Sequence, residues 1–105
     1  MTINPTVQEL DAMIAAGKPV VLDLYGEWCT PCKMMAPIFE KAGAANAERA
    51  EFVKIDIDVL PELAERYGVM SVPCIIGIVG GEVKHMSSGI MNEAALNTLV
   101  DNLSE

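Results

Sequence analysis

The chain has 105 residues, of which 51% are hydrophobic but only 5% aromatic, so we expect one domain over residues 1–105 with a core of aliphatic residues and methionine. Seven basic against fifteen acidic residues give a net charge of −8, which argues against nucleic-acid binding because that binding depends on Lys and Arg contacts with phosphates. The sequence shows no signal peptide and no apolar run near the ~20 residues of a membrane span, so we expect a cytoplasmic protein without membrane contact.

Hydrophobic periodicity and chain-breaking residues divide the sequence into alternating helices and strands. In chain order, the first half predicts a short edge strand near Ile3, a helix over Thr6–Ala16, a buried strand over Pro19–Tyr25, a helix over Thr30–Ala47 and a strand over Glu51–Asp58. The second half predicts a helix over Pro61–Tyr67, strands over Val72–Val79 and Glu82–Ser87, and a helix after the N-cap Asn92. Alternating elements give parallel neighbours and Gly80-Gly81 marks a hairpin, so we expect a mixed sheet with helices on both faces.

Cys29 and Cys32 form a C-x-x-C motif at the junction between a predicted strand and a predicted helix. The unpaired N–H groups and the dipole at a helix N-terminus favour negative charge, so Cys29 is expected to ionise more readily than a free cysteine. Pro31 lies in the first helical turn, where its missing N–H leaves no hydrogen bond unmade. Cys32, further into the helix, is expected to be more buried. The motif predicts thiol–disulfide exchange, in which Cys29 attacks an external disulfide and Cys32 resolves the mixed disulfide.

Several further residues stand out against their predicted surroundings. Asp23 lies in the middle of an apolar strand, where desolvation raises the pKa of a carboxyl group and suits it to accept a proton from a poorly ionised thiol. Lys54 on the next predicted strand is expected to pair with Asp23 and to oppose that shift. A proline inside a predicted strand cannot donate to the sheet, so we expect a cis peptide bond at Val72–Pro73. Trp28, directly before the first cysteine, is expected to shield the thiols.

Together these motifs resemble the thioredoxin family. The segment Trp28-Cys29-Thr30-Pro31-Cys32-Lys33 follows Val21-Leu22-Asp23, and Pro37, Val72-Pro73 and Gly80-Gly81 come after it in the family's order and spacing. The resemblance implies the thioredoxin fold, a central mixed sheet of four to five strands flanked by four helices. It also implies a protein with no bound cofactor, whose redox-active disulfide Cys29–Cys32 is recharged by a flavoprotein reductase that uses NADPH.

The resemblance assigns roles to individual residues. Cys29 is then the nucleophile and Cys32 the resolving thiol, while Asp23 acts as the buried acid/base together with Lys54. A cis Pro73 faces the disulfide and keeps metal ions away from it. The residues implied in the groove for a substrate peptide are Trp28, Thr30, Pro31, Val72 and Gly89. The implied partners of this monomer are target proteins that contain disulfides.

The chain departs from the family pattern in three ways. Thr30 stands where glycine is usual, and a hydroxyl that donates to the Cys29 thiolate predicts a more oxidising pair. Cys74 follows Pro73 where threonine is common. The N-terminal strand is short, and Ile76–Val79 lacks the usual phenylalanine. We expect these departures to affect the redox potential and the choice of partner, and to leave the fold unchanged.

The sequence favours a reductase of protein disulfides over two alternatives. Related oxidases and isomerases carry histidine where Pro31 precedes Cys32, and this chain has none there. Thr30 alone favours a more oxidising relative that acts as an oxidase or isomerase. The other alternative is a non-redox scaffold subunit that uses the same fold.

Several residues have a structural interpretation beside a functional one. A zinc site or an iron–sulfur cluster shared between two chains is disfavoured, because each needs about four ligands. Cys74 is predicted to be a buried hydrophobic residue, with a regulatory or dimer-forming thiol as the alternative. Met70, Met86 and Met91 fit either core filling or an adaptable protein-binding surface. His85 has no sequence partner that would make it a ligand or a base.

Overall fold

The computed structural model describes all residues from Met1 to Glu105. Its helices are α1 (Val7–Ala15), α2 (Thr30–Ala45), α3 (Pro61–Arg66) and α4 (Glu93–Leu103). Its strands are β1 (Thr2–Ile3), β2 (Val20–Tyr25), β3 (Glu51–Asp56), β4 (Cys74–Val79) and β5 (Glu82–Ser88). Every predicted helix and strand is therefore present, in the predicted order.

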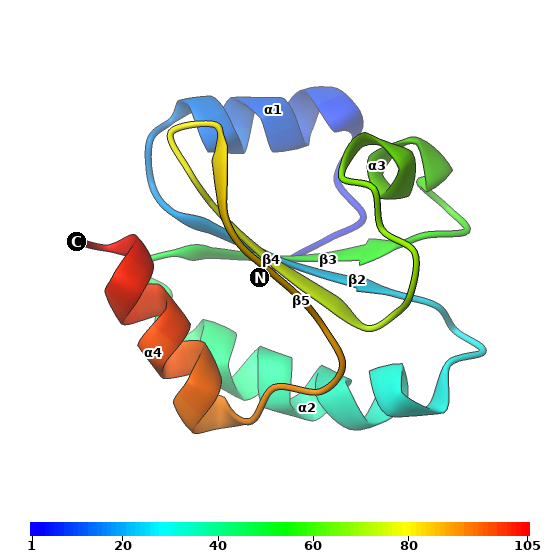
Figure 1. Ribbon diagram of the computed structural model, residues 1–105. Coiled ribbons are helices and arrows are strands. Elements are labelled where there is room, and N and C mark those ends of the chain that lie inside the picture. Colours follow the sequence, from blue (N-terminus) through cyan, green and yellow to red (C-terminus); the bar gives the residue numbers. More distant parts are fainter.

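The strands form one five-stranded mixed sheet in the order β1-β3-β2-β4-β5. β3 runs parallel to β1 and β2, whereas β4 is antiparallel to β2 and β5. Figure 1 shows α1 and α3 over one face of the sheet and α2 and α4 over the other. The arrangement confirms the expected α/β fold class and makes β2, which leads into the C-x-x-C motif, the central strand.

Local sequence explains where the helices begin. The Thr6 hydroxyl accepts a hydrogen bond from the Glu9 N–H at 3.0 Å, and the Glu9 carboxylate accepts one from the Thr6 N–H at 2.8 Å. This reciprocal capping box starts α1. Asn92 starts α4, because its side chain accepts a hydrogen bond from the Ala95 N–H at 2.8 Å. The N-cap of α2 is Cys29, so the first cysteine of the motif has a structural position as well as a chemical one.

Three boundaries differ by two residues from the sequence prediction, and the others fall within one residue of it. α2 ends early because Asn46 leaves the helical backbone conformation. β3 ends at Asp56, whose carboxylate accepts a hydrogen bond from the Asp58 N–H at 2.9 Å and so forms a turn. β4 begins only at Cys74, because Pro73 has no N–H to donate to the sheet.

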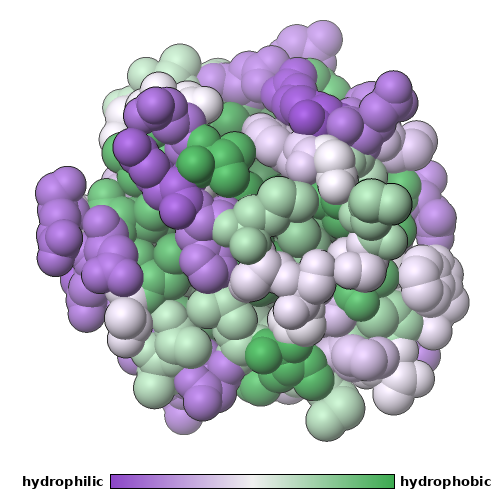
Figure 2. Space-filling view, viewed as in Figure 1, coloured by the Kyte–Doolittle hydropathy of each residue, from purple (hydrophilic) through white to green (hydrophobic).

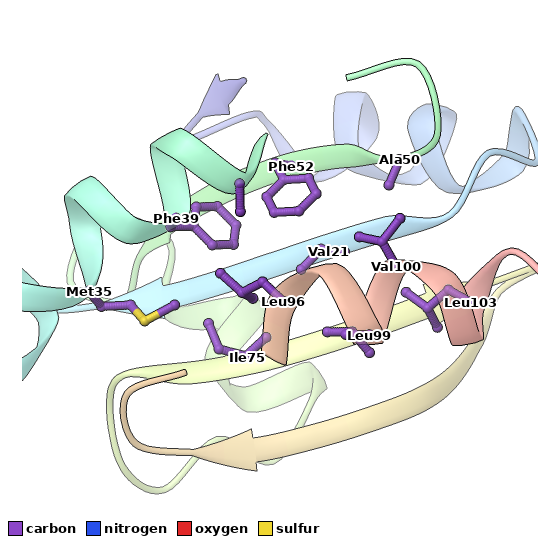
Figure 3. Close-up of a cluster of buried hydrophobic side chains, with 11 residues drawn as sticks. Val21, Met35, Phe39, Ala50, Phe52, Ile75, Leu96, Leu99, Val100 and Leu103 are labelled. Carbon is purple, nitrogen blue, oxygen red and sulfur yellow. The ribbon is translucent and has the colours of Figure 1, made fainter. Parts of the chain in front are cut away.

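Two apolar clusters form the core, one on each face of the sheet. In the first, Met35 and Phe39 of α2 and the leucines of α4 point toward the sheet, as Figure 3 shows. The rings of Phe39 and Phe52 lie 4.9 Å apart between their centroids. The second cluster contains Leu10 of α1 and Cys74 of β4. Because β2 contributes side chains to both clusters, its residues are almost all buried.

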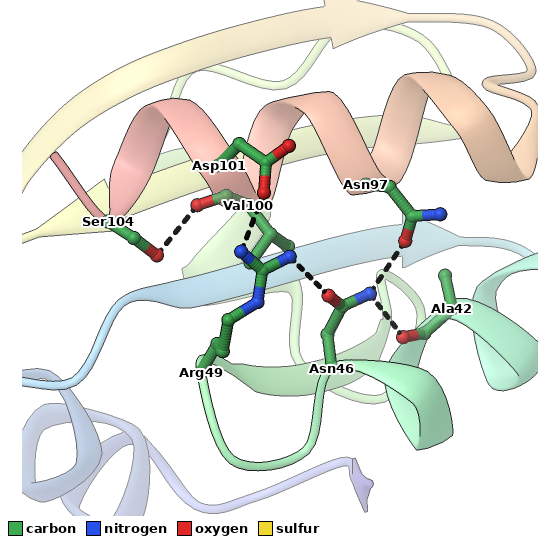
Figure 4. A network of polar contacts seen from close by, with 7 residues as sticks. All are labelled: Ala42, Asn46, Arg49, Asn97, Val100, Asp101 and Ser104. Atoms are coloured by element: carbon green, nitrogen blue, oxygen red, sulfur yellow. Dashed lines mark hydrogen bonds and ion pairs between the residues drawn. The ribbon is translucent and has the colours of Figure 1, made fainter.

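A polar network joins the end of α2 to α4 (Figure 4). The Asn46 amide donates to the Ala42 carbonyl and to the Asn97 side chain, both at 2.8 Å, and its oxygen accepts from Arg49 at 2.7 Å. Arg49 also donates to Asp101 at 2.6 Å. Asn46 is only 4% exposed, so these bonds satisfy a buried amide that would otherwise have no partner.

Replacing Asn46 tests how much this network stabilises the fold. We expect Asn46→Ala to lower the free energy of unfolding by about 2 kcal/mol, because it removes hydrogen bonds and leaves the Asn97 and Arg49 groups without their partner. Urea unfolding of the oxidised protein measures the change. Asn102→Ala on the exposed surface of α4 is the matched control, with an expected change below about 0.5 kcal/mol. Equal changes in the two variants would contradict a stabilising network.

The surface combines charged regions with exposed apolar side chains. In Figure 2, hydrophilic residues gather along the upper edge of the view, over α1 and α3, while paler and apolar residues occupy much of the centre. The exposed large apolar side chains include Trp28, Met34, Val59, Met70 and Ile90. No helix combines the length and the apolar character that crossing a bilayer requires.

Candidate active site

Cys29 and Cys32 form a disulfide at the N-terminus of α2, with their Cα atoms 5.2 Å apart. The Cys32 N–H points at Cys29 Sγ from 3.2 Å, so the helix presents a backbone donor to the first sulfur. Both cysteines are nearly inaccessible, Cys29 being 5% and Cys32 3% exposed. The expected order of burial is present, but the difference is small. The helix N-terminus therefore favours a negative charge on Cys29 Sγ once the disulfide is reduced.

Two loops at the same end of the sheet, one before β4 and one after β5, complete the surroundings of the disulfide. The Val72–Pro73 peptide bond is cis, as the sequence predicted. The Val72 carbonyl oxygen lies 3.7 Å from Cys29 Sγ. The Pro73 carbonyl accepts a hydrogen bond from the Gly89 N–H at 2.8 Å, and Gly89 has a φ of +102°, a conformation that favours glycine. The fold thus places Val72 against Cys29 and joins Gly89 to Pro73, which brings together four of the predicted site residues.

Trp28 lies on the surface beside the disulfide, with 64% of its area exposed. Its indole N–H donates to the Asp58 carboxylate at 2.9 Å. The indole lies flat against Gly26, where a Cβ atom would come within 2.5 Å of the ring. Sequence reasoning missed both Gly26 and Asp58, since no local pattern connects a tryptophan to a carboxylate 30 positions further along the chain.

Asp23 is fully buried in β2, and neither of its carboxylate oxygens has a hydrogen-bond partner. Desolvation raises its pKa to about 6, and the positive charge of Lys54 opposes this shift. Lys54 is the register neighbour of Asp23 on β3, yet the two form no ion pair. Instead, Lys54 Nζ lies 4.6 Å from the centroid of the Tyr25 ring, a contact that the sequence did not indicate.

A small cavity of about 120 Å³ opens between the end of β2 and the first turns of α2. Cys32, Lys54 and Tyr25 are among its lining residues, together with Gly26 and Glu27. The second cysteine is therefore the one reached from this side of the molecule, while Cys29 lies against the Val72 carbonyl.

The remaining active-site turn residues, Thr30 and Pro31, are exposed at the start of α2. In this oxidised state the Thr30 hydroxyl makes no hydrogen bond to Cys29, whose sulfur receives only the Cys32 N–H. Thr30 and Pro31 are therefore accessible to a partner molecule, although the cysteines on either side of them are nearly inaccessible.

The other residues singled out from the sequence lie apart from the disulfide. Cys74 is 1% exposed in the second apolar cluster, and its pKa is raised by burial and then by the charge of Asp23. This confirms it as a buried hydrophobic residue. Met91 packs against the first cluster, whereas Met70 is 97% exposed, so the methionines do not share one role. His85 contacts the Ser87 hydroxyl at 2.9 Å. The structure contains no group of three or more His, Cys, Asp or Glu residues suited to a metal ion.

Comparisons with known proteins agree with this geometry. The thioredoxin family model matches residues 1–102. Thioredoxin of Bacillus subtilis is 37% identical over 99 residues, which cover 94% of each chain. A bifunctional thioredoxin reductase/thioredoxin of Mycobacterium leprae is 33% identical over 96 residues, 87% of this chain and 21% of that one. The solved structure of a single-site mutant of thioredoxin from Halobacterium salinarum superposes with a TM-score of 0.88 at 33% identity, covering 99% of this chain and 90% of the other.

Proposed function

Because the chain belongs to the thioredoxin family and is a thiol–disulfide oxidoreductase, we propose that its Cys29–Cys32 pair reduces the disulfides of other proteins. The observation that carries the proposal is the Cys29–Cys32 disulfide itself, which caps α2 and faces the Val72 carbonyl. A cysteine at a helix N-terminus supplies the thiolate that thiol–disulfide exchange requires.

In the first step the Cys29 thiolate attacks one sulfur of the target disulfide. The target S–S bond breaks, a mixed disulfide forms with Cys29, and the released target thiolate takes a proton from water. The Cys32 N–H, 3.2 Å from Cys29 Sγ, stabilises the attacking thiolate before the reaction.

In the second step the Cys32 thiolate attacks Cys29 Sγ, the bond between Cys29 and the target breaks, and the second target sulfur leaves as a thiolate that takes a proton from water. Cys32 must first lose its proton, and we propose Asp23 as the acceptor. A buried carboxylate with no hydrogen-bond partner and a pKa of about 6 is ionised near neutral pH and remains a stronger base than an ordinary aspartate. The step ends with the Cys29–Cys32 disulfide, so each cycle transfers two electrons to the target.

The surface around Cys29 supports a groove for an extended target segment. Trp28, Thr30 and Pro31 are exposed on one side of the disulfide, and Val72 and Gly89 are half-buried on the other. The Trp28 indole is held by Asp58, which gives the groove a fixed apolar wall. We propose that Pro73 fixes the Val72 carbonyl toward the incoming chain.

We further propose that a flavoprotein reductase using NADPH returns electrons to the pair, and that the protein works as a cytoplasmic monomer without a bound cofactor. The fusion of a thioredoxin reductase with a thioredoxin in Mycobacterium leprae supports this choice of partner. A continuous supply of electrons also fits a reducing compartment, where disulfides do not persist.

The equilibrium reduction potential of the pair tests the proposed direction of the reaction. We expect a value near −270 mV, roughly the general value for thioredoxins. Trp28 fluorescence in thiol buffers of defined composition measures it, because the indole lies beside the disulfide. A value near −180 mV, about that of protein disulfide isomerase, would contradict the proposal and favour an oxidase or isomerase.

Thr30 variants show whether the departure from glycine tunes this potential. If the Thr30 hydroxyl donates to the Cys29 thiolate, Thr30→Val lowers the potential by about 30 mV, because one such bond is equivalent to about 1.4 kcal/mol. Thr30→Ser, which keeps the hydroxyl, is the matched control. Equal potentials in the three proteins would leave the hydroxyl without a role.

A further inference from the structure

Asp23 and Tyr25 alternate along β2 with Leu22 and Leu24, which belong to the second cluster, so their side chains project from the opposite face of the sheet. This is the face that α2 covers (Figure 1). Lys54 and Asp56 occupy the matching positions on β3, beside Asp23 and Tyr25 respectively. The buried carboxylate of Asp23, the Lys54 ammonium and the Tyr25 ring therefore form one group at the C-terminal ends of two parallel strands.

The Lys54 ammonium has two competing neighbours in this group. An unpartnered buried carboxylate attracts an ammonium on a flexible stem, because the charge of each then offsets the desolvation of the other. The ammonium nevertheless forms no ion pair with Asp23 and instead lies 4.6 Å from the Tyr25 ring centroid. The face of an aromatic ring attracts a cation by its quadrupole, so the ring supplies the force that holds it there.

We propose that Tyr25 is a positioning residue whose ring holds the Lys54 ammonium beside the Asp23 carboxylate but out of contact with it. This inference rests on the proposed role of Asp23 as the proton acceptor. A carboxylate in direct contact with an ammonium binds a proton weakly and is a poor base. At a distance, the same ammonium moderates the desolvation of Asp23 without removing its basicity.

The other groups around Asp23 do not replace the ring in this role. On β4 its register neighbour is Ile75, which carries no charge, and Cys74 is buried in the cluster on the opposite face of the sheet. On α2 two titratable residues line the cavity: Cys32, which is held in the disulfide here, and Lys33, which is exposed to solvent. Burial raises the pKa of Tyr25, and the negative charges of Asp56 and Glu27 raise it further, so the phenol is neutral at physiological pH.

The cavity beside this group gives the ammonium room to move. Lys54 and Tyr25 both line it, so a shorter side chain at position 25 enlarges the space next to the lysine. In Tyr25→Leu the ammonium loses the ring and is free to approach the carboxylate. The midpoint for titration of Asp23 is then expected to fall by about one pH unit, the effect of bringing an opposite charge into contact.

NMR titration of the Asp23 side-chain carboxyl carbon measures this midpoint directly. Tyr25→Phe keeps the ring and is expected to leave the midpoint unchanged. Tyr67, the other tyrosine, packs against the cluster on the opposite face of the sheet. Tyr67→Leu is therefore also expected to leave the Asp23 midpoint unchanged. A midpoint in Tyr25→Leu that stays at the wild-type value, or rises above it, overturns the proposal.

A double-mutant cycle shows whether Tyr25 acts through Lys54. Lys54→Gln removes the positive charge and is expected to raise the Asp23 midpoint. Adding Tyr25→Leu to Lys54→Gln is then expected to cause no further shift, because there is no ammonium left to position. The same downward shift in both backgrounds would overturn the proposal, since Tyr25 would then act by packing or desolvation alone.

The unmodified protein provides a second measurement that does not depend on how the variants fold. The Lys54 Cε methylene protons are expected to resonate upfield of those of the exposed Lys41, because the Nζ atom bonded to Lys54 Cε lies over the Tyr25 ring. Equal shifts would overturn the proposal. These experiments measure titration and chemical shift, so they test the role of Tyr25 whether or not turnover depends on Asp23. If Asp23 proves dispensable for turnover, its proposed role as the base is refuted.

Discussion

Cys29→Ser is expected to abolish the reduction of protein disulfides, with turnover falling by a factor on the order of a thousand or more. The serine hydroxyl can cap α2, but it does not ionise near neutral pH and is a poor nucleophile toward sulfur. Turnover of a model protein disulfide with dithiothreitol as the electron source measures the loss. Turnover above about a tenth of wild type would contradict the assignment of Cys29 as the nucleophile.

Cys32→Ser and Cys74→Ala complete this test, because each isolates a different step or site. Cys32→Ser keeps the nucleophile but cannot resolve the mixed disulfide, so a covalent adduct with the target is expected to accumulate and to be visible by mass spectrometry. Cys74→Ala removes the third cysteine, which is buried in the cluster on the opposite face. Cys74→Ala is therefore expected to keep the turnover of the wild type. If the protein is a non-redox scaffold, all three variants are expected to keep their biological activity.

Replacing the buried Asp23 is expected to change how stability depends on pH. Its pKa is about 6 in the folded protein against 3.8 for an unperturbed carboxyl group. The folded state therefore prefers the protonated form, and its stabilising contribution is fully present below pH 3.8 and disappears as the pH rises through about 6. A difference of this size corresponds to about 3 kcal/mol.

Urea unfolding of the oxidised protein between pH 4 and about pH 8 tests this expectation. Wild type should lose about 2.5 kcal/mol relative to Asp23→Asn across this range, since the variant has no carboxyl group to ionise. Glu48→Gln, which replaces an exposed carboxylate without an ion pair or a side-chain hydrogen bond, should follow the wild-type profile. Parallel profiles for wild type and Asp23→Asn would mean that Asp23 is not held in a desolvated site.

Most of the fold could be predicted because its signals are local. The continuous apolar run of β2, the glycine pair of the last hairpin and the Asn92 cap each depend on a few neighbouring residues. The boundaries that differ depend on contacts from elsewhere. Asn46 ends α2 partly because Asn97 and Arg49 are there to bind its amide, and sequence position alone does not place those partners.

The site divides in the same way. The cysteine spacing, the isolated Asp23 and the Val72–Pro73 bond were visible in the sequence because each contradicts its surroundings. The direction in which Lys54 points was not, since a lysine between a carboxylate and an aromatic ring can favour either one, and only packing at the ends of the strands decides. The Trp28–Asp58 contact was missed because Asp58 lies in the turn after β3, and the sequence does not specify the shape of that turn.

The atom that begins α2 is also the atom that reacts. Cys29 Sγ accepts the Cys32 N–H as a neutral disulfide sulfur in the oxidised protein, and reduction turns it into an anion, which is a stronger acceptor. Each catalytic cycle therefore tightens and loosens the first turn of the helix. Electron storage and helix stability are thermodynamically linked in this protein, and any substitution that changes how well α2 is capped also changes how readily the pair gives up its electrons.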